Sequence, residues 1–159
     1  MRILGIDPGI GRMGWGVIEV KSTKLKVQSY GCVETYSKEK TELRLLYIYK
    51  SVVKIIKENS PDALSIEELF FNTNAKTAFV VGQARGVVLL AAAEKKIPVH
   101  IYTPLQVKIA VTGYGRAEKN QIGQMVKVLL KLKEIPKPDD VADALAVALT
   151  HAFTKKFTK

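Results

Sequence analysis

The sequence has little of what several protein classes require. Cys32 is the only cysteine among 159 residues, which excludes a disulfide scaffold and favours a reducing compartment. The most apolar stretch, Val87 to Ala93, is far shorter than the roughly 20 residues that span a bilayer. Only a short apolar run precedes Asp7, which does not fit a secretory signal. We therefore expect a cytoplasmic protein with no membrane partner.

Acidic residues are also scarce relative to basic ones. The chain has 15 Asp and Glu against 25 Lys and Arg, a formal net charge of +10. Such an excess indicates a polyanionic partner, nucleic acid first. Because 20 of the 25 cations are lysines, phosphate contacts are favoured over bidentate reading of bases. Charge alone does not separate this interpretation from a basic surface that only keeps the protein soluble.

No repeat or low-complexity linker divides the chain. Its length suffices for one core, because a domain of this size buries roughly 68–70% of the surface of its unfolded chain. A hydrophobic content of 47% and a charged content of 25% are ordinary for a folded globular protein. We expect a single domain over residues 1–159.

Hydrophobic periodicity predicts an α/β fold. Alternating and apolar segments predict strands at Arg2–Asp7, Gly14–Val20, Val27–Thr35, Ala63–Glu67 and Val99–Tyr102. Spacings of three and four predict helices at Lys38–Asn59, from Asn74 to Lys96 and from Pro104 to about Gly113, and two more that carry Ile122 to Leu130 and Val141 to Leu149. This order predicts a mixed five-stranded sheet, an antiparallel meander plus parallel strands, flanked by helices.

The chemistry lies in the carboxylates. Three of only five aspartates fall within residues 139–143, and Asp140 and Asp143 share one face of a predicted helix. Asp7 ends the first predicted strand and Glu67 ends the fourth. A carboxylate at the tip of a buried strand is costly unless it is compensated, and a divalent cation is the usual compensation. If these two strands are neighbours, four acids converge at one sheet edge, as hard ligands for Mg²⁺ or Mn²⁺.

Ordinary explanations exist for some of these residues. Asp139 lies in the first turn of a helix, where any acid interacts favourably with the helix dipole. Asp7 is followed by Pro and Gly, so it could belong to a simple turn. Glu67 and Glu68 point to opposite faces of a strand, so at most one joins the cluster, and parity favours Glu67.

Six short motifs, in order along nearly the whole chain, resemble the RuvC family of bacterial Holliday-junction resolvases. They are Gly5-Ile6-Asp7-Pro8-Gly9, Ser65-Ile66-Glu67-Glu68-Leu69-Phe70, Gly82-Gln83-Ala84-Arg85-Gly86, Gln106-Val107-Lys108, Ala117-Glu118-Lys119 and Asp140-Val141-Ala142-Asp143-Ala144-Leu145-Ala146. The resemblance implies a ribonuclease H-like fold, a homodimer and Mg²⁺-dependent paired nicking of four-way DNA junctions. It also implies a branch-migration complex of the RuvA and RuvB type as a partner.

The resemblance carries roles over to individual residues. Asp7, Glu67, Asp140 and Asp143 match the family's catalytic acids, which implies that they hold two Mg²⁺ ions, with Mn²⁺ as a substitute. The implied or candidate DNA contacts are Phe70, Lys108 and Lys119, to which we add Arg116 from a basic loop and Lys76. Gly82 and Gly86 are four residues apart on a helix, a spacing that could mark the dimer seam but from spacing alone favours contact with the sheet.

Two other functions fit parts of this pattern. One is a different ribonuclease H-like nuclease that acts on RNA or on RNA/DNA hybrids. The other is a non-catalytic DNA-binding module, or a phosphate-binding relative of the sugar-kinase and actin group. Use of ATP by a relative of the sugar-kinase and actin group would need a second Gly-rich phosphate loop and a longer chain. A protein that only binds DNA has no use for four converging acids.

Overall fold

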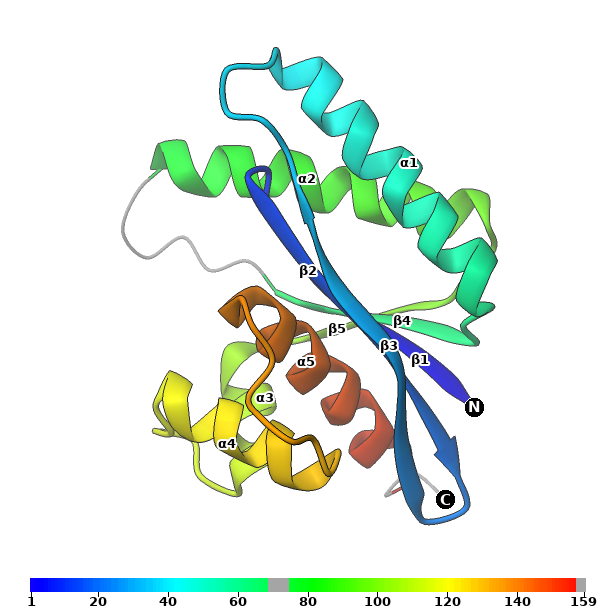
Figure 1. Cartoon of the computed structure of the whole chain (residues 1–159), viewed down its shortest axis with the longest axis vertical. Coiled ribbons are helices and arrows are strands. Elements are labelled where there is room, and N and C mark those ends of the chain that lie inside the picture. The colour runs from blue at the N-terminus through cyan, green and yellow to red at the C-terminus, as the bar shows by residue number, and fades with distance from the viewer. Residues whose placement is uncertain (69–74, 157–159) are drawn as a thin grey trace.

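A computed structural model describes residues 1–68 and 75–156, and its centre is one five-stranded sheet (Figure 1). The strand order is β3-β2-β1-β4-β5. β1, β2 and β3 pair antiparallel, whereas β4 pairs parallel with β1 and with β5. The strands are β1 Arg2–Asp7, β2 Arg12–Lys21, β3 Lys24–Glu34, β4 Ala63–Glu67 and β5 Val99–Tyr102. The predicted α/β fold with a mixed sheet is confirmed.

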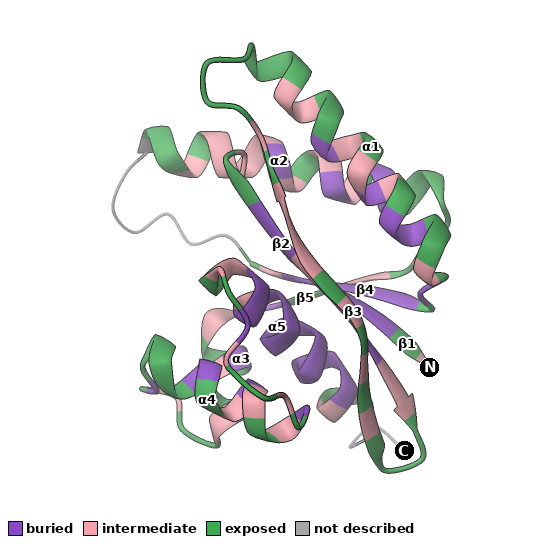
Figure 2. Ribbon diagram, in the orientation of Figure 1, coloured by how far each residue is buried: buried purple, intermediate pink, exposed green. Residues whose placement is uncertain are grey.

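Helices cover both faces of this sheet (Figure 1). α1 and α2 lie on one face, and α3, α4 and α5 lie on the other. Their bounds are α1 Thr41–Asn59, α2 Ala75–Glu94, α3 Pro104–Thr112, α4 Lys119–Leu129 and α5 Asp139–Lys156. α5 is buried along most of its length (Figure 2), so this helix forms the centre of its layer.

Capping residues explain where α3 begins and ends. The Thr103 hydroxyl accepts a hydrogen bond from the Gln106 amide, and the Gln106 side chain accepts one from the Thr103 amide. Pro104 occupies the first turn, where its missing N–H costs nothing. Gly113 ends the helix at φ 75°, a left-handed conformation that glycine adopts without strain. The bounds predicted for this helix, from Pro104 to about Gly113, agree with these ends.

Strand parity separates two hydrophobic clusters. Ile3 points toward α5, and the next residue, Leu4, points toward α1 and α2; both side chains are fully buried. Successive side chains of a strand alternate between faces, so every second residue of β1 reaches the same layer. The apolar run at the start of the chain is therefore buried on both sides, as its composition predicted.

The β2–β3 hairpin is longer than predicted. Lys21 pairs with Lys24, which leaves only Ser22 and Thr23 in the turn. The prediction ended both strands where apolar alternation fades, but backbone pairing continues through exposed lysines because a sheet ladder needs no apolar side chains there. Asn74, from which α2 was predicted to begin, lies outside the described residues.

α2 is apolar on more than one side. By length and composition alone, Lys76–Glu94 could cross a membrane, with a mean hydropathy of 1.3, although only 22% of that window is buried. Ala84, Val88 and Ala92 pack in the core beneath α1. This packing identifies α2 as a core helix whose other side is exposed and apolar. The sequence prediction considered only Val87 to Ala93 and missed the length of the apolar segment.

Candidate active site

Two neighbouring parallel strands each end in an acidic residue at the same edge of the sheet. β1 and β4 pair in register up to Ile6 and Ile66, and Asp7 and Glu67 follow directly. Gly5 faces α5, because a β-carbon there would touch the backbone of that helix, and Asp7 shares its parity. The sheet therefore directs the Asp7 and Glu67 side chains toward the α5 layer. The predicted choice of Glu67 over Glu68 agrees with this register.

α5 brings the other two predicted acids over the same edge. Asp140 and Asp143 lie in its first turns, three residues apart. The helix sits close to the sheet because glycines line its path: a β-carbon on Gly14 would lie 1.9 Å from the Asp140 carbonyl oxygen. Any side chain at that position would push the start of α5 away. Both carboxylates are only partly exposed, with 25% and 27% of the respective side chains accessible.

The four carboxylates interact electrostatically across these elements. Burial raises the pKa of Asp7 to about 7, and the negative charges of Asp143, Asp140 and Glu67 contribute in that order. Burial and the charge of Asp143 also raise the pKa of Glu67. A carboxylate whose pKa is raised this far by burial and by neighbouring carboxylates lies in a site that favours protons or cations. All three of the other predicted acids act on Asp7 in this way.

Two basic side chains contact the acids of α5. Lys119 Nζ lies 2.9 Å from Asp143 Oδ2 and 3.7 Å from Asp139 Oδ2. Burial alone would lower the pKa of Lys119, but the hydrogen bond and charge of Asp143 outweigh it and raise that pKa. Arg12 Nε lies 3.4 Å from Asp140 Oδ2. These cations offset part of the negative charge that the cluster collects.

The donor set suits a hard divalent cation. All four groups are carboxylates, which are the ligands that Mg²⁺ and Mn²⁺ prefer. Asp140 Oδ2 is buried and, beyond its ion pair with Arg12, has no hydrogen-bond partner within the described residues. Within residues 1–68 and 75–156, no three acidic, histidine or cysteine side chains already converge on one metal position. Coordination of one metal by three of these groups therefore requires their side chains to move.

A cavity of about 350 Å³ opens beside the acids. Glu67 and Asp143 line it, and Lys108, Arg116 and Lys119 contribute cations from α3, from the loop after α3 and from the start of α4. Positive charge next to a carboxylate cluster is what a phosphodiester needs in order to approach otherwise repulsive groups. Three of the predicted DNA contacts therefore share one cavity with two of the predicted catalytic acids.

Two predicted contacts stand apart from that cavity. Lys76 is exposed near the start of α2, in the layer on the opposite face of the sheet from α5. Phe70 lies outside the described residues. In contrast, the sequence interpretation did not single out Arg12, because a lone arginine that follows glycine carries no recognisable signal. Only the three-dimensional contact with Asp140 reveals it.

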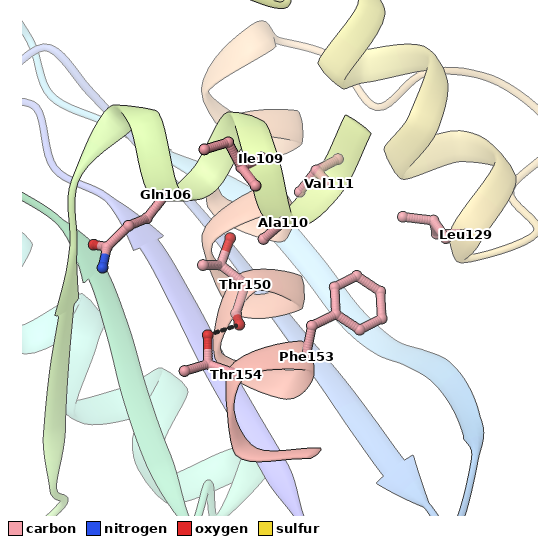
Figure 3. A pocket seen from close by; sticks show the side chains of 8 residues that line it. All are labelled: Gln106, Ile109, Ala110, Val111, Leu129, Thr150, Phe153 and Thr154. Atoms are coloured by element: carbon pink, nitrogen blue, oxygen red, sulfur yellow. Dashed lines mark hydrogen bonds between the residues drawn. The ribbon is translucent and has the colours of Figure 1, made fainter. Parts of the chain in front are cut away.

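A second, apolar cavity lies away from the carboxylates. Its volume is about 570 Å³, between α3, the end of α4 and the C-terminal half of α5 (Figure 3). The Thr154 hydroxyl donates to the Thr150 carbonyl oxygen at 2.8 Å along one wall. Its lining residues are Gln106, Ile109, Ala110, Val111, Leu129, Thr150, Phe153 and Thr154. None of these described lining residues is acidic or basic, so the lining differs in chemistry from that of the first cavity.

Comparisons with known proteins agree on one family. The family model described as crossover junction endodeoxyribonuclease RuvC matches residues 3–151. A relative with that name from Alkaliphilus oremlandii is 56% identical over 159 residues, 100% of this chain and 97% of the relative. Another, from Desulforamulus reducens, is 59% identical over 152 residues, 96% of this chain and 93% of the relative.

Solved structures give the same answer. The structure of Thermus thermophilus RuvC matches with a TM-score of 0.91 and 41% identity, covering 98% of this chain and 96% of that one. T. thermophilus RuvC in complex with a Holliday junction substrate matches with a TM-score of 0.93 and 42% identity, covering 98% and 95%. The similarity therefore spans the sheet, both helical layers and the acidic edge.

Proposed function

This chain belongs to the RuvC family of crossover junction endodeoxyribonucleases, and we propose that it resolves Holliday junctions. From the acidic sheet edge we further propose that it does so with Mg²⁺ held by Asp7, Glu67, Asp140 and Asp143. The enzyme is a metal-dependent nuclease that hydrolyses DNA phosphodiester bonds. The observation that carries the assignment to these residues is the parallel pairing of β1 and β4 beneath the start of α5, which gives four carboxylates at one sheet edge; burial and the other three carboxylates raise the pKa of Asp7 there.

The four carboxylates have complementary roles in this proposal. Asp7 and Glu67 are fixed by the sheet, and Asp140 and Asp143 by the first turns of α5, so the two pairs would hold two Mg²⁺ ions between rigid elements. Bound Mg²⁺ supplies an activated water and stabilises charge on the leaving 3′ oxygen. Mn²⁺ should substitute, because it takes the same oxygen ligands.

Basic residues position the DNA. Lys108, Arg116 and Lys119 line the cavity beside Glu67 and Asp143, where they can contact phosphates on either side of the cut. Lys119 already lies within hydrogen-bond distance of Asp143, so its charge is available where negative charge develops on the phosphate. These contacts are to the backbone and carry no base specificity.

We also assign a homodimer, on the basis of α2. Phe79 and Leu90 are 68% and 61% exposed, and a β-carbon on Gly86 would touch nothing within 4 Å. Gly86 therefore does not pack on the sheet, contrary to the preference from spacing, and it leaves a smooth apolar face for a second copy. A four-way junction is close to two-fold symmetric, so a two-fold dimer with one site per subunit makes paired cuts naturally.

Location and further partners follow from the proposed reaction. An enzyme that acts on recombining DNA in bacteria works in the cytoplasm, and the single cysteine fits that compartment. A branch-migration complex of the RuvA and RuvB type would supply its substrate. The test for this association is co-purification of each component with the enzyme on a synthetic four-way junction.

One cleavage experiment tests the main proposal. Purified protein is incubated with a synthetic four-way junction and either Mg²⁺ or a chelator, at constant salt. We expect two symmetric nicks with ligatable ends in Mg²⁺ and none in the chelator. A linear duplex and an RNA/DNA hybrid of the same sequence are the control substrates. Faster cutting of the hybrid than of the junction would instead support a ribonuclease on the same fold.

Asp7→Asn separates catalysis from binding in the same assay. We expect this variant to bind the junction with nearly unchanged affinity and to cut it no faster than the chelator control. Equal loss of binding and of cutting would show that Asp7 supports the structure rather than the chemistry.

A further inference from the structure

Arg12 forms an ion pair that the proposed mechanism does not use. It is the first residue of β2, and its Nε lies 3.4 Å from Asp140 Oδ2 at the start of α5. The guanidinium side chain is 57% exposed, whereas that of Asp140 is 25% exposed. The acceptor oxygen is buried and has no hydrogen-bond partner in the described part of the chain. Arg12 is therefore the cation nearest to an oxygen that is otherwise unsatisfied.

The surroundings of Arg12 do not anchor it elsewhere. Its strand neighbour across the β2–β3 ladder is Glu34, yet the ion pair formed is with Asp140. Burial raises the pKa of the nearby Cys32 thiol; the charge of Asp140 adds to this rise and that of Arg12 opposes it. The exposed stem of Arg12 leaves the guanidinium room to move without disturbing the core.

We propose that Arg12 is a positioning residue that acts through Asp140: its guanidinium pairs with that carboxylate in the metal-free protein and competes with the metal for it. The inference rests on the proposed metal role of Asp140. Because an arginine keeps its proton in proteins, the ion pair cannot be broken by deprotonation. The guanidinium must move aside when a divalent cation takes the oxygen. Arg12 thus raises the metal concentration at which the site fills.

The direction in which Mn²⁺ affinity changes when Arg12 is replaced separates this role from a structural one. Removing a ligand's structural support weakens metal binding, whereas removing a competing cation strengthens it. We expect Arg12→Gln to bind Mn²⁺ about three- to tenfold more tightly, because a unit charge near an exposed site interacts only weakly through water. Arg12→Lys retains the charge and should bind Mn²⁺ within about twofold of wild type.

The measurement is calorimetric titration of Mn²⁺ into the full-length protein without DNA, at pH 8 and fixed ionic strength. Lys21→Gln is the matched control, because Lys21 also pairs with an acid, Glu19 at 3.4 Å, but at the other end of β2. It should leave Mn²⁺ affinity unchanged. In an Asp140→Asn background, Arg12→Gln should lose its effect, since coupled residues are non-additive.

Three outcomes would overturn the inference. Unchanged or weaker Mn²⁺ binding by Arg12→Gln, with Asp140→Asn still reducing affinity, rejects the role of Arg12 and leaves the proposed function intact. A tightening that persists in the Asp140→Asn background means that Arg12 acts through another group. Wild-type Mn²⁺ affinity in Asp140→Asn itself rejects the metal role of Asp140, and both proposals fail at that residue.

Discussion

The carbonyl oxygen of Asp140 occupies the space where a side chain on Gly14 would begin. An added β-carbon at Gly14 would lie 1.9 Å from that oxygen and 2.8 Å from the Val141 nitrogen. The beginning of α5 therefore rests directly on the backbone of β2. This contact fixes how far Asp140 and Asp143 stand from Asp7 on the neighbouring strand.

Gly14→Ala should displace the start of α5. We expect a loss of about 1–3 kcal/mol in the free energy of unfolding, as for other overpacked sites, together with most of the junction cleavage. Thermal unfolding and the cleavage assay measure the two effects. Gly11→Ala is the control, because a β-carbon there meets only the Arg44 guanidinium at 3.8 Å. A wild-type melting temperature for Gly14→Ala would contradict the close contact.

The raised pKa of Asp7 makes stability depend on pH. Its pKa is about 7 in the folded protein and 3.8 in the reference state, so the folded state holds the proton to higher pH. The resulting stabilisation is complete below about pH 3.8 and is lost as the pH rises through about 7. We expect Asp7→Asn to melt about 5 °C higher than wild type at pH 8 in chelator, with the difference shrinking toward pH 4.

The comparison is a series of thermal melts from pH 4 to pH 8. Glu58→Gln serves as the control, because Glu58 is an exposed carboxylate on α1 that pairs only loosely, 3.8 Å from Lys54. Its melting temperature should follow that of wild type throughout. Parallel curves for Asp7→Asn and wild type would show that Asp7 has no raised pKa in solution.

Asp139 and Asp143, four residues apart at the start of α5, should differ sharply in importance. Asp143 is 27% exposed and touches Lys119, whereas the Asp139 side chain is 74% exposed. We expect Asp143→Asn to lower the cleavage rate about 10²- to 10³-fold, the range for loss of one transition-state contact. Asp139→Asn should cut at close to the wild-type rate. Single-turnover cleavage measures both rates, and an inactive Asp139→Asn would mean that the wrong neighbour was assigned.

If the apolar face of α2 forms the dimer interface, a charge placed on that face should weaken dimerisation. Leu90→Asp places a carboxylate on that face and should weaken dimerisation roughly 30-fold or more, as loss of an interface hot spot does. Sedimentation at several concentrations, with and without junction DNA, gives the dissociation constant. Val128→Asp is the matched control, because Val128 is 64% exposed on α4. If wild type is monomeric in all conditions, the dimer assignment is wrong.

Lys108 should contribute to DNA binding through charge alone. Lys108→Gln removes one cation from the cavity beside Glu67, so affinity should fall for every DNA substrate, and the slope of log affinity against log salt should decrease by about 0.9. Lys54→Gln, on α1, removes a cation from the opposite face and should change neither value. Fluorescence anisotropy in chelator at several salt concentrations measures both. An unchanged slope for Lys108→Gln would exclude a phosphate contact.

Much of the acidic edge could be predicted because successive side chains of a strand point to opposite faces of the sheet. Ile3 to Ile6 had to be buried on both faces, so Asp7 was marked as an exception at the strand end. The same reasoning selected Glu67, and helical spacing joined Asp140 to Asp143. The strand order that makes β1 and β4 neighbours was only a condition in the sequence argument. Long-range pairing depends on the packing of the whole chain, which local patterns do not encode.

The charged partners of the acids could not be predicted. Arg12 and Lys119 belong to different elements, and their contacts with α5 depend on side-chain reach rather than on any periodicity. The side of α2 on which Gly86 lies was left open for a similar reason, since spacing alone does not say which side of that helix meets the sheet. The extent of a single domain over residues 1–159 stays a prediction.

The direct packing of α5 on the backbone of β1 and β2 affects how this protein responds to core substitutions. Where side chains separate a helix from a sheet, replacing a large residue by a small one changes the distance between them and shifts the helix. At Gly14 and Gly5 the backbone of α5 faces the backbone of the sheet directly, so no side chain there sets that distance. Substitutions among the core leucines and isoleucines should therefore change how firmly the molecule holds together while leaving the separation of the reactive oxygens almost untouched.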